Sequence, residues 1–145
     1  FGENIMAIPS IGGGRQFGDG NVNELVLSVQ ADVQTATSTA TLTAAQTTGG
    51  ILVGNPSTTA ATYTLPTAAA LDASVGNAKV GSTFDLTIIN LGTSTGLITV
   101  AVGTGITAVG NLVVAITGSA AGVGGAGVFR FRKTGTSAWS VYRVS

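Results

Sequence analysis

Residues 83–90 read Thr-Phe-Asp-Leu-Thr-Ile-Ile-Asn, and this stretch decides the fold class. Phe84, Leu86 and Ile88 occupy every second position, so an extended backbone places all three on one face. The β-branched Thr and Ile residues also favour extended backbone. The stretch therefore predicts a strand with one face in a hydrophobic core, and Ile89 begins the other face.

Further short strands are expected on both sides of this stretch, separated by turns rich in Gly, Thr and Ser. The alternating patterns predict strands at residues 24–34, 35–43, 51–53, 61–65, 97–102, 112–117, 128–133 and 138–144. A strand roughly every 8–15 residues is typical of sandwiches and barrels. We predict an all-β fold, an antiparallel β-sandwich or jelly-roll-like domain over residues 22–145.

One short helix is expected within this domain. Residues 68–74 contain four alanines and follow Thr67, whose hydroxyl can cap the first turn, while Gly76 follows as a stop. Residues 43–46 are compatible with a single helical turn, so residues 68–74 are expected to form the one full helix.

Residues 1–21 predict an extended, Gly-rich N-terminal arm. Five glycines fall within residues 12–20, and glycine at that density does not hold a regular element by itself. Ile8, Ile11 and Phe17 give this segment apolar side chains, and Arg15 gives it a charge. These residues favour an arm that docks on a partner; a tail packed on its own domain is the alternative.

The composition excludes several kinds of chemistry. The 145 residues include six basic and six acidic side chains, no histidine and no cysteine. Zinc fingers, disulfide frameworks and histidine-based catalysis are therefore excluded. We expect no enzyme, no cofactor and no metal site, because the six acids are spread over residues 3–85 without a nucleophile motif.

The charges also bear on partners. Only 8% of the residues are charged, against about 25% in an average domain, and a net charge of zero favours association over solubility. Nucleic-acid binding is not expected without a basic excess. Residues 86–129 carry no charge, but the glycines at 118–127 argue against a membrane helix.

The two signs of charge are unevenly placed along the chain. Residues 1–85 hold two basic and six acidic side chains, a net charge of −4, and residues 86–145 hold four basic ones and no acid. The two parts can attract each other within one subunit or between neighbouring subunits, and the sequence leaves both open.

Two motifs near the C-terminus have a structural interpretation. Residues 122–127 match G-x-G-x-x-G, but a strand pattern follows them where a nucleotide site needs a helix, so a glycine loop is predicted. Residues 129–133 alternate aromatic and basic side chains, which resembles a stacking platform for single strands. The zero net charge favours Phe129 and Phe131 in the core, which leaves Arg130 and Arg132 to pair with a neighbour's acids.

Residues 40–144 resemble a recurring module of tailed-bacteriophage virion proteins, of the capsid cement or head decoration type found in environmental and cyanobacterial phages. The resembling segments are ATLTAAQTTGGILVGNPSTTAATYTLPTAAALDASVGNAKVGSTFDLTIINLG (40–92), ITVAVGTGITAVGN (98–111) and GVFRFRKTGTSAWSVYRVS (127–145). The resemblance implies a β-sandwich module, a homotrimer on the capsid exterior and the major capsid protein as partner. It brings no catalytic residues.

The expected function is therefore to stabilise a capsid by bridging capsomers. The expected capsid or subunit contacts are Ile8, Ile11, Arg15, Phe17, Leu25, Leu27, Val29, Arg130 and Arg132. Strand addition to a neighbour's sheet edge is the expected mode for residues 25–33. The alternative is a receptor- or carbohydrate-binding module, which needs exposed aromatics from among Tyr63, Trp139 and Tyr142.

Overall fold

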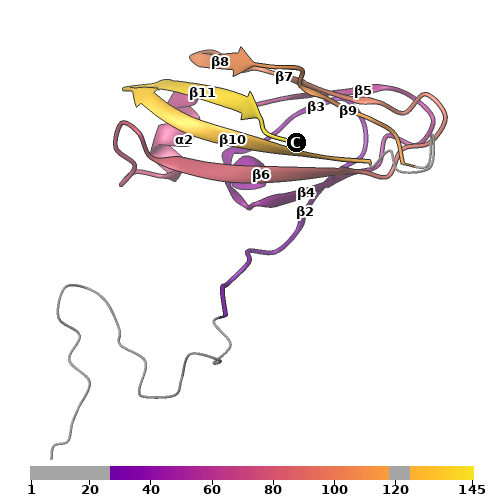
Figure 1. Ribbon diagram of the computed structural model, residues 1–145, viewed down its shortest axis with the longest axis horizontal. Coiled ribbons are helices and arrows are strands. Elements are labelled where there is room, and N and C mark those ends of the chain that lie inside the picture. The colour runs from indigo at the N-terminus through magenta and orange to yellow at the C-terminus, as the bar shows by residue number, and fades with distance from the viewer. Residues whose placement is uncertain (1–26, 118–124) are drawn as a thin grey trace, which may run out of the picture.

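The computed structural model describes residues 27–117 and 125–145, and these form ten strands in two sheets together with two short helices (Figure 1). The predicted all-β class is confirmed. The larger sheet has the order β2 (Gln34–Ala36), β4 (Ile51–Gly54), β6 (Thr83–Asn90), β10 (Ala126–Gly135), β11 (Ala138–Arg143) and β8 (Ile106–Val109). The smaller sheet has the order β3 (Ala40–Thr41), β5 (Ala61–Thr64), β7 (Ile98–Ala101) and β9 (Val113–Val114).

The expectation of antiparallel sheets is wrong. From β2 to β10, successive strands alternate between the larger and the smaller sheet. From β2 to β7, each return to the same sheet restores the strand direction, so β2, β4 and β6 run parallel, and so do β3, β5 and β7. The intervening strand serves as the crossover that parallel neighbours require. The pairs β6–β10, β10–β11 and β7–β9 are antiparallel, whereas β8 lies parallel to β11.

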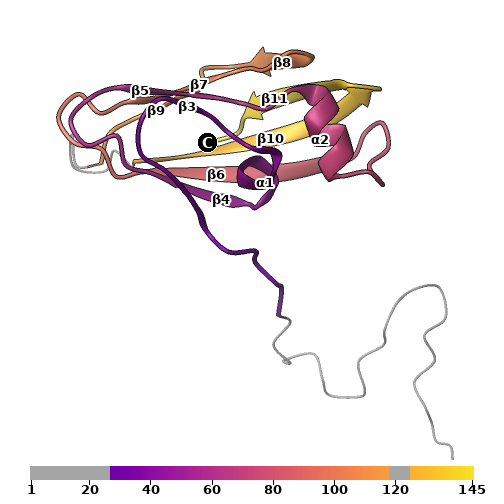
Figure 2. The same ribbon diagram turned by 180° about the vertical axis from the view of Figure 1, so that it is seen from behind.

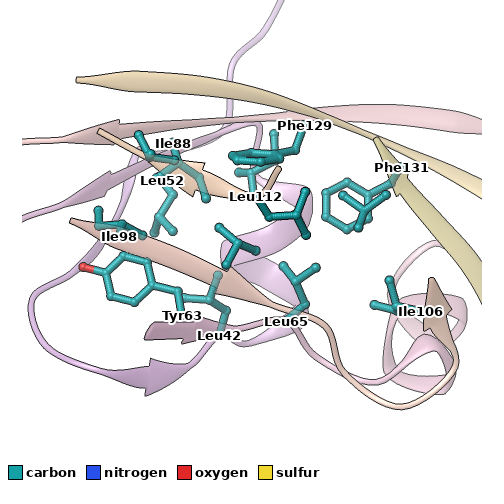
Figure 3. Packing of buried hydrophobic residues seen from close by; sticks show 14 of the residues in the cluster. Leu42, Leu52, Tyr63, Leu65, Ile88, Ile98, Ile106, Leu112, Phe129 and Phe131 are labelled. Carbon is teal, nitrogen blue, oxygen red and sulfur yellow. The ribbon is translucent and has the colours of Figure 1, made fainter. Parts of the chain in front are cut away.

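The hydrophobic core lies between the two sheets (Figure 3). Leu86 and Ile88 of β6 are fully buried in it, as their spacing predicted, while Phe84 is partly buried at its end. The largest fully buried side chains are Trp139, Tyr63, Phe129 and Phe131. The outward residues of β10 alternate with these phenylalanines, which confirms the core interpretation of residues 129–133.

Three strand predictions need correction. Residues 27–33 form no strand. The predicted strand at 35–43 is interrupted: β2 ends at Ala36, a bend follows, and β3 covers only Ala40–Thr41. Only Val113–Val114 is a strand within residues 112–117. The strand β8 was not predicted at all, because only Ile106 of its four residues is buried and no apolar alternation marks it.

The helix α2 (Ala68–Ser74) is confirmed, and Thr67 Oγ1 accepts a hydrogen bond from the Ala70 N–H at 3.2 Å. The prediction of a single helix is wrong, because α1 (Ala44–Thr48) is a second one. It is stabilised by a reciprocal cap: the Gln46 N–H donates to Thr43 Oγ1 at 3.1 Å, and the Thr43 N–H donates to Gln46 Oε1 at 2.9 Å.

The helices α1 and α2 pack side by side (Figure 2). Among the described residues, neither helix has the length and apolar character that crossing a bilayer demands. The predicted arm at residues 1–21 lies outside the described residues.

Candidate functional site

Arg130 forms an ion pair with Asp85 on the outer face of the larger sheet. The two residues are direct partners in the β6–β10 register, and their side chains are about half exposed, at 52% and 42%. Arg130 Nε donates to Asp85 Oδ1 at 2.8 Å and Nη2 donates to Oδ2 at 2.9 Å. The guanidinium lowers the pKa of Asp85 below its usual range. Arg130 is therefore paired within its own chain, and Arg132 is exposed two positions further along the same face.

Asp72 of α2 is the centre of a second polar network. Its carboxylate accepts hydrogen bonds from Lys133 Nζ, from the Ser137 N–H at 2.7 Å and from Trp139 Nε1 at 2.8 Å. The Lys133 hydrogen bond, followed by the Ser137 and Trp139 donors, lowers the pKa of Asp72 to about 2. A carboxylate that accepts three donors and stays ionised is unsuited to act as a general base near neutral pH. Its role is to attach α2 to the β10–β11 hairpin.

These two ion pairs bear on the uneven charge distribution. Asp85 and Asp72 belong to the acidic part of the chain, and Arg130 and Lys133 belong to the basic part. In both pairs the opposite charges meet within one chain. For these four residues, the acidic and basic parts therefore attract each other within one subunit and not between subunits.

A pocket of about 220 Å³ lies beside the Asp72 network. It is lined by Val75, Asn77, Ala78, Ser82, Thr83, Phe84 and Trp139. The Phe84 ring stacks on Phe131 with centroids 4.7 Å apart and meets Trp139 edge-on at 5.5 Å. The pocket is smaller than ordinary ligand sites of about 300–1,000 Å³ and has no ionisable group in its wall. It has room for a small apolar group and offers no acid–base chemistry.

A second hollow of about 230 Å³ lies near the start of the described chain. Its wall consists of Thr37, Ser38, Thr39, Pro56, Thr59, Ala60 and Ala61. Hydroxyl and methyl groups of this kind can contact a partner, but they provide neither a nucleophile with its base nor an oxyanion site. Within the described residues, no three acidic side chains gather as a metal site would require.

The aromatic residues considered for sugar binding have different surroundings. Tyr63 is fully buried and its hydroxyl donates to the Ala36 carbonyl at 2.9 Å. Trp139 is only 1% exposed. Tyr142 is partly exposed on the outer face of the larger sheet and is the register partner of Arg130. Of these three aromatics, Tyr142 is therefore the one that a ligand can reach.

The predicted contact residues are brought together only in part. Ile8, Ile11, Arg15, Phe17 and Leu25 lie outside the described residues. Leu27 is 81% exposed and Val29 is fully exposed, in the segment that leads into β2. Arg130 and Arg132 lie elsewhere, on the outer face of β10. The structure thus places no described pair of these contact residues in a common cleft.

Sequence reasoning missed the edge strand β8 and the buried Asn90. Asn90 Nδ2 donates to the carbonyls of Gly96, Val114 and Ala115 at 2.9, 3.2 and 3.0 Å, and its Oδ1 accepts from the Gly92 N–H at 2.7 Å. The position of Asn90 at the end of an apolar strand was the available signal.

Comparisons with protein-family models, with curated proteins and with solved structures find no match.

Proposed function

We propose that the chain is a structural protein of a bacteriophage virion, which decorates the capsid exterior and stabilises it by bridging capsomers. The proposal rests above all on one observation: Leu27 and Val29 carry exposed apolar side chains on a segment that forms no strand with the body (Figure 1). An exposed apolar segment is a typical means of contact with a partner. The protein does this work mechanically, without catalysis.

The low charge and the architecture support the same proposal. A cement protein needs many weak contacts over a wide surface, and a chain with 8% charged residues has little electrostatic barrier to them. Two sheets around a shared core support a β-sandwich as the finer description of the fold. We further propose that the functional unit is a homotrimer.

The proposed partners are the major capsid protein and further copies of this chain. Residues 1–33 provide the contact through the side chains of Ile8, Ile11, Arg15, Phe17, Leu25, Leu27 and Val29. Arg130 and Arg132 add contact on the outer face of the larger sheet, where Arg130 already holds Asp85.

Deleting residues 1–21 tests the proposal. The full chain and the truncated chain are mixed with capsids that lack this protein, and binding is measured by co-sedimentation and by electron microscopy of the particles. We expect the full chain to decorate the capsids and the truncated chain to lose attachment while keeping its β-type circular dichroism. A matched variant of full length, with Ile8, Ile11 and Phe17 changed to Ser, separates the loss of apolar contacts from the loss of length. Undiminished decoration by both altered chains would contradict the proposal.

A receptor- or carbohydrate-binding module of a phage fibre is the second candidate, and Tyr142 is the observation in its favour. The partly exposed ring lies beside the Arg130–Asp85 pair, and sugar sites combine an aromatic face with polar groups. A glycan array with the full chain and with Tyr142→Ala is the appropriate test. Specific binding that disappears in Tyr142→Ala would favour this candidate over the cement function.

A further inference from the structure

The strand β8 is an unprotected edge of the larger sheet. It is the last strand in the sheet order, and its residues Thr107, Ala108 and Val109 are exposed. Its sequence Ile-Thr-Ala-Val contains no charge and no proline. Natural sheet edges are normally blunted by such residues, because an open edge pairs readily with another chain.

The main chain of β8 has hydrogen-bonding groups directed away from β11. The Trp139 N–H donates to the Gly105 carbonyl at 3.0 Å, and Thr107 is the register partner of Ser140. In a parallel ladder the residues that bond to the neighbour alternate, so Thr107 bonds toward β11. The N–H and C=O of Ala108 consequently point to the open side.

The edge at β9 is protected by side chains. Leu112 bonds toward β7, so Val113 faces the open side, where Arg143 Nη1 donates to its carbonyl at 2.6 Å; Asn90 Nδ2 donates to the Ala115 carbonyl at 3.0 Å. A second strand could not use these carbonyls without displacing both side chains.

The edge at β2 is also partly occupied. The Ala36 carbonyl accepts from the Asn55 N–H and thus faces β4, so Thr35 faces the open side, where its carbonyl accepts from Gln46 Nε2 at 2.9 Å. The strand β3 has only two residues. Among the edges of the described sheets, β8 is therefore the longest, and unlike β2 and β9 it has no main-chain group bonded by a side chain.

Residues 27–33 have the sequence pattern of a strand but pair with no strand of their own chain, so they could supply the strand that the open β8 edge lacks. Leu27, Val29, Ala31 and Val33 occupy every second position, which is the pattern of a half-buried strand. Within its own chain this segment forms no strand, and both Leu27 and Val29 are exposed. The side chain of Gln30 bonds to the Gly49 carbonyl and attaches the segment to the α1–β4 turn. Gln30 Nε2 also donates to the Ala31 carbonyl at 3.1 Å, and Gln34 Nε2 donates to the Asp32 carbonyl at 2.8 Å, so an added strand that uses these carbonyls would displace the two side chains.

We propose that residues 27–33 of one copy add as a strand to the β8 edge of a second copy. The segment leads into β2, and β2 and β8 are opposite edges of the same six-stranded sheet. Figures 1 and 2 both show residues 27–33, the indigo segment just before β2, leaving the body on the side opposite β8. Donor and acceptor thus lie at opposite ends of the subunit, which gives a head-to-tail contact that closes into a ring when the rotation permits.

This inference deepens the self-association that the proposed function requires, and it names the two surfaces involved. The added strand would direct Leu27 and Val29 to one face of the extended sheet and Ser28 to the other. Main-chain hydrogen bonds would supply affinity, and the two apolar side chains would fix the register.

Sedimentation velocity of the purified full chain, over a range of concentrations and without capsids, provides the first test. We expect an oligomer for the unaltered chain. Ala108→Pro removes the outward N–H without breaking the β8–β11 ladder, and Val29→Lys places a charge on the buried face of the donor. Both variants should sediment as monomers, whereas the matched control Ser28→Lys should remain oligomeric.

Cross-linking provides a second test that does not depend on disrupting the fold. The chain has no cysteine, so Ser28→Cys and Thr107→Cys each introduce a single thiol. We expect a disulfide-linked dimer when the two single variants are mixed and oxidised, and far less product from either variant alone. Mixtures that use Gln30→Cys in place of Ser28→Cys, or Val109→Cys in place of Thr107→Cys, test pairing of the segment with β8 in a register shifted by two residues.

Several results would overturn the inference: a monomer at every concentration, an oligomer unaffected by Ala108→Pro, or no cross-link in any mixed pair. An oligomer that persists in Ala108→Pro and still decorates capsids would leave the proposed function standing. Assembly through β8 by a chain that never binds capsids would support the inference and contradict the proposed function.

Discussion

The indole Nε1 of Trp139 donates a hydrogen bond of 2.8 Å to Asp72 Oδ1, across 67 positions of sequence. Trp139 is buried in the core, so its N–H needs an acceptor inside the protein. Asp72 supplies it from α2 and is itself held ionised by Lys133. This hydrogen bond therefore attaches α2 to β11, and its acceptor Asp72 is also the acidic member of the ion pair with Lys133 of β10.

Acidification should destabilise the protein through Asp72. Its pKa is lowered to about 2 in the folded state, against about 3.9 in an unfolded chain. A lowered folded pKa gives stability that is fully present above about pH 4 and is lost as the pH falls toward 2. Asp85, whose pKa is also lowered, acts in the same direction. Urea unfolding at a series of pH values between 7 and 2 measures this loss.

Asp72→Asn should lower the stability at pH 7 and reduce the loss on acidification. The matched control is Asp32→Asn, since Asp32 is exposed and belongs to neither ion pair. An acid transition of unchanged size in Asp72→Asn would show that other groups are responsible for it.

Asn90→Ala should be strongly destabilising. The substitution leaves several buried main-chain groups without the Asn90 side chain, and each unsatisfied group costs about 1–3 kcal/mol. We expect a loss of about 3 kcal/mol or more in the free energy of unfolding from urea titration. Asn111→Ala is the control, because Asn111 is exposed and its side chain makes a single bond to the Val113 N–H. Equal losses in the two variants would refute this role.

Gly54→Ala should destabilise the fold by overpacking. A Cβ at Gly54 would lie 2.5 Å from Ile98 Cδ1 and 2.9 Å from the ring of Tyr63, between the two sheets. Overpacking of this kind costs about 1–3 kcal/mol. Gly76→Ala is the comparison, since its Cβ would have only the Asp72 carbonyl at 3.9 Å. Thermal unfolding of both variants should show a lower Tm for Gly54→Ala alone.

Thr43→Ala should lower stability by about 1 kcal/mol, because it removes the hydroxyl that caps α1. Thr67→Ala should do the same at α2. The exposed loop residue Thr58 provides the control, and Thr58→Ala should stay within about 0.5 kcal/mol of the unaltered chain. Urea unfolding distinguishes these values, and a neutral Thr43→Ala would mean that α1 forms without its cap.

Part of the candidate site could be predicted from the sequence. The alternation at residues 129–133 placed the phenylalanines inside and Arg130 outside, because the side-chain period of a strand is a local property. The partner of Arg130 could not be predicted in this way. Asp85 becomes its neighbour only through the β6–β10 register, which joins residues 45 positions apart.

The sequence by itself determined that this is a β protein, that residues 83–90 form a core strand and that Thr67 begins a helix, since alternation and capping act over a few residues. The tertiary structure alone decided that strands β2 to β10 alternate between two sheets, so that β2, β4 and β6 run parallel in the larger one. It also decided that residues 27–33 remain unpaired in their own chain and that β8 remains open. A strand pattern is satisfied by any neighbour of suitable shape, so only the packing of the whole chain selects which edges are used and which remain for another subunit.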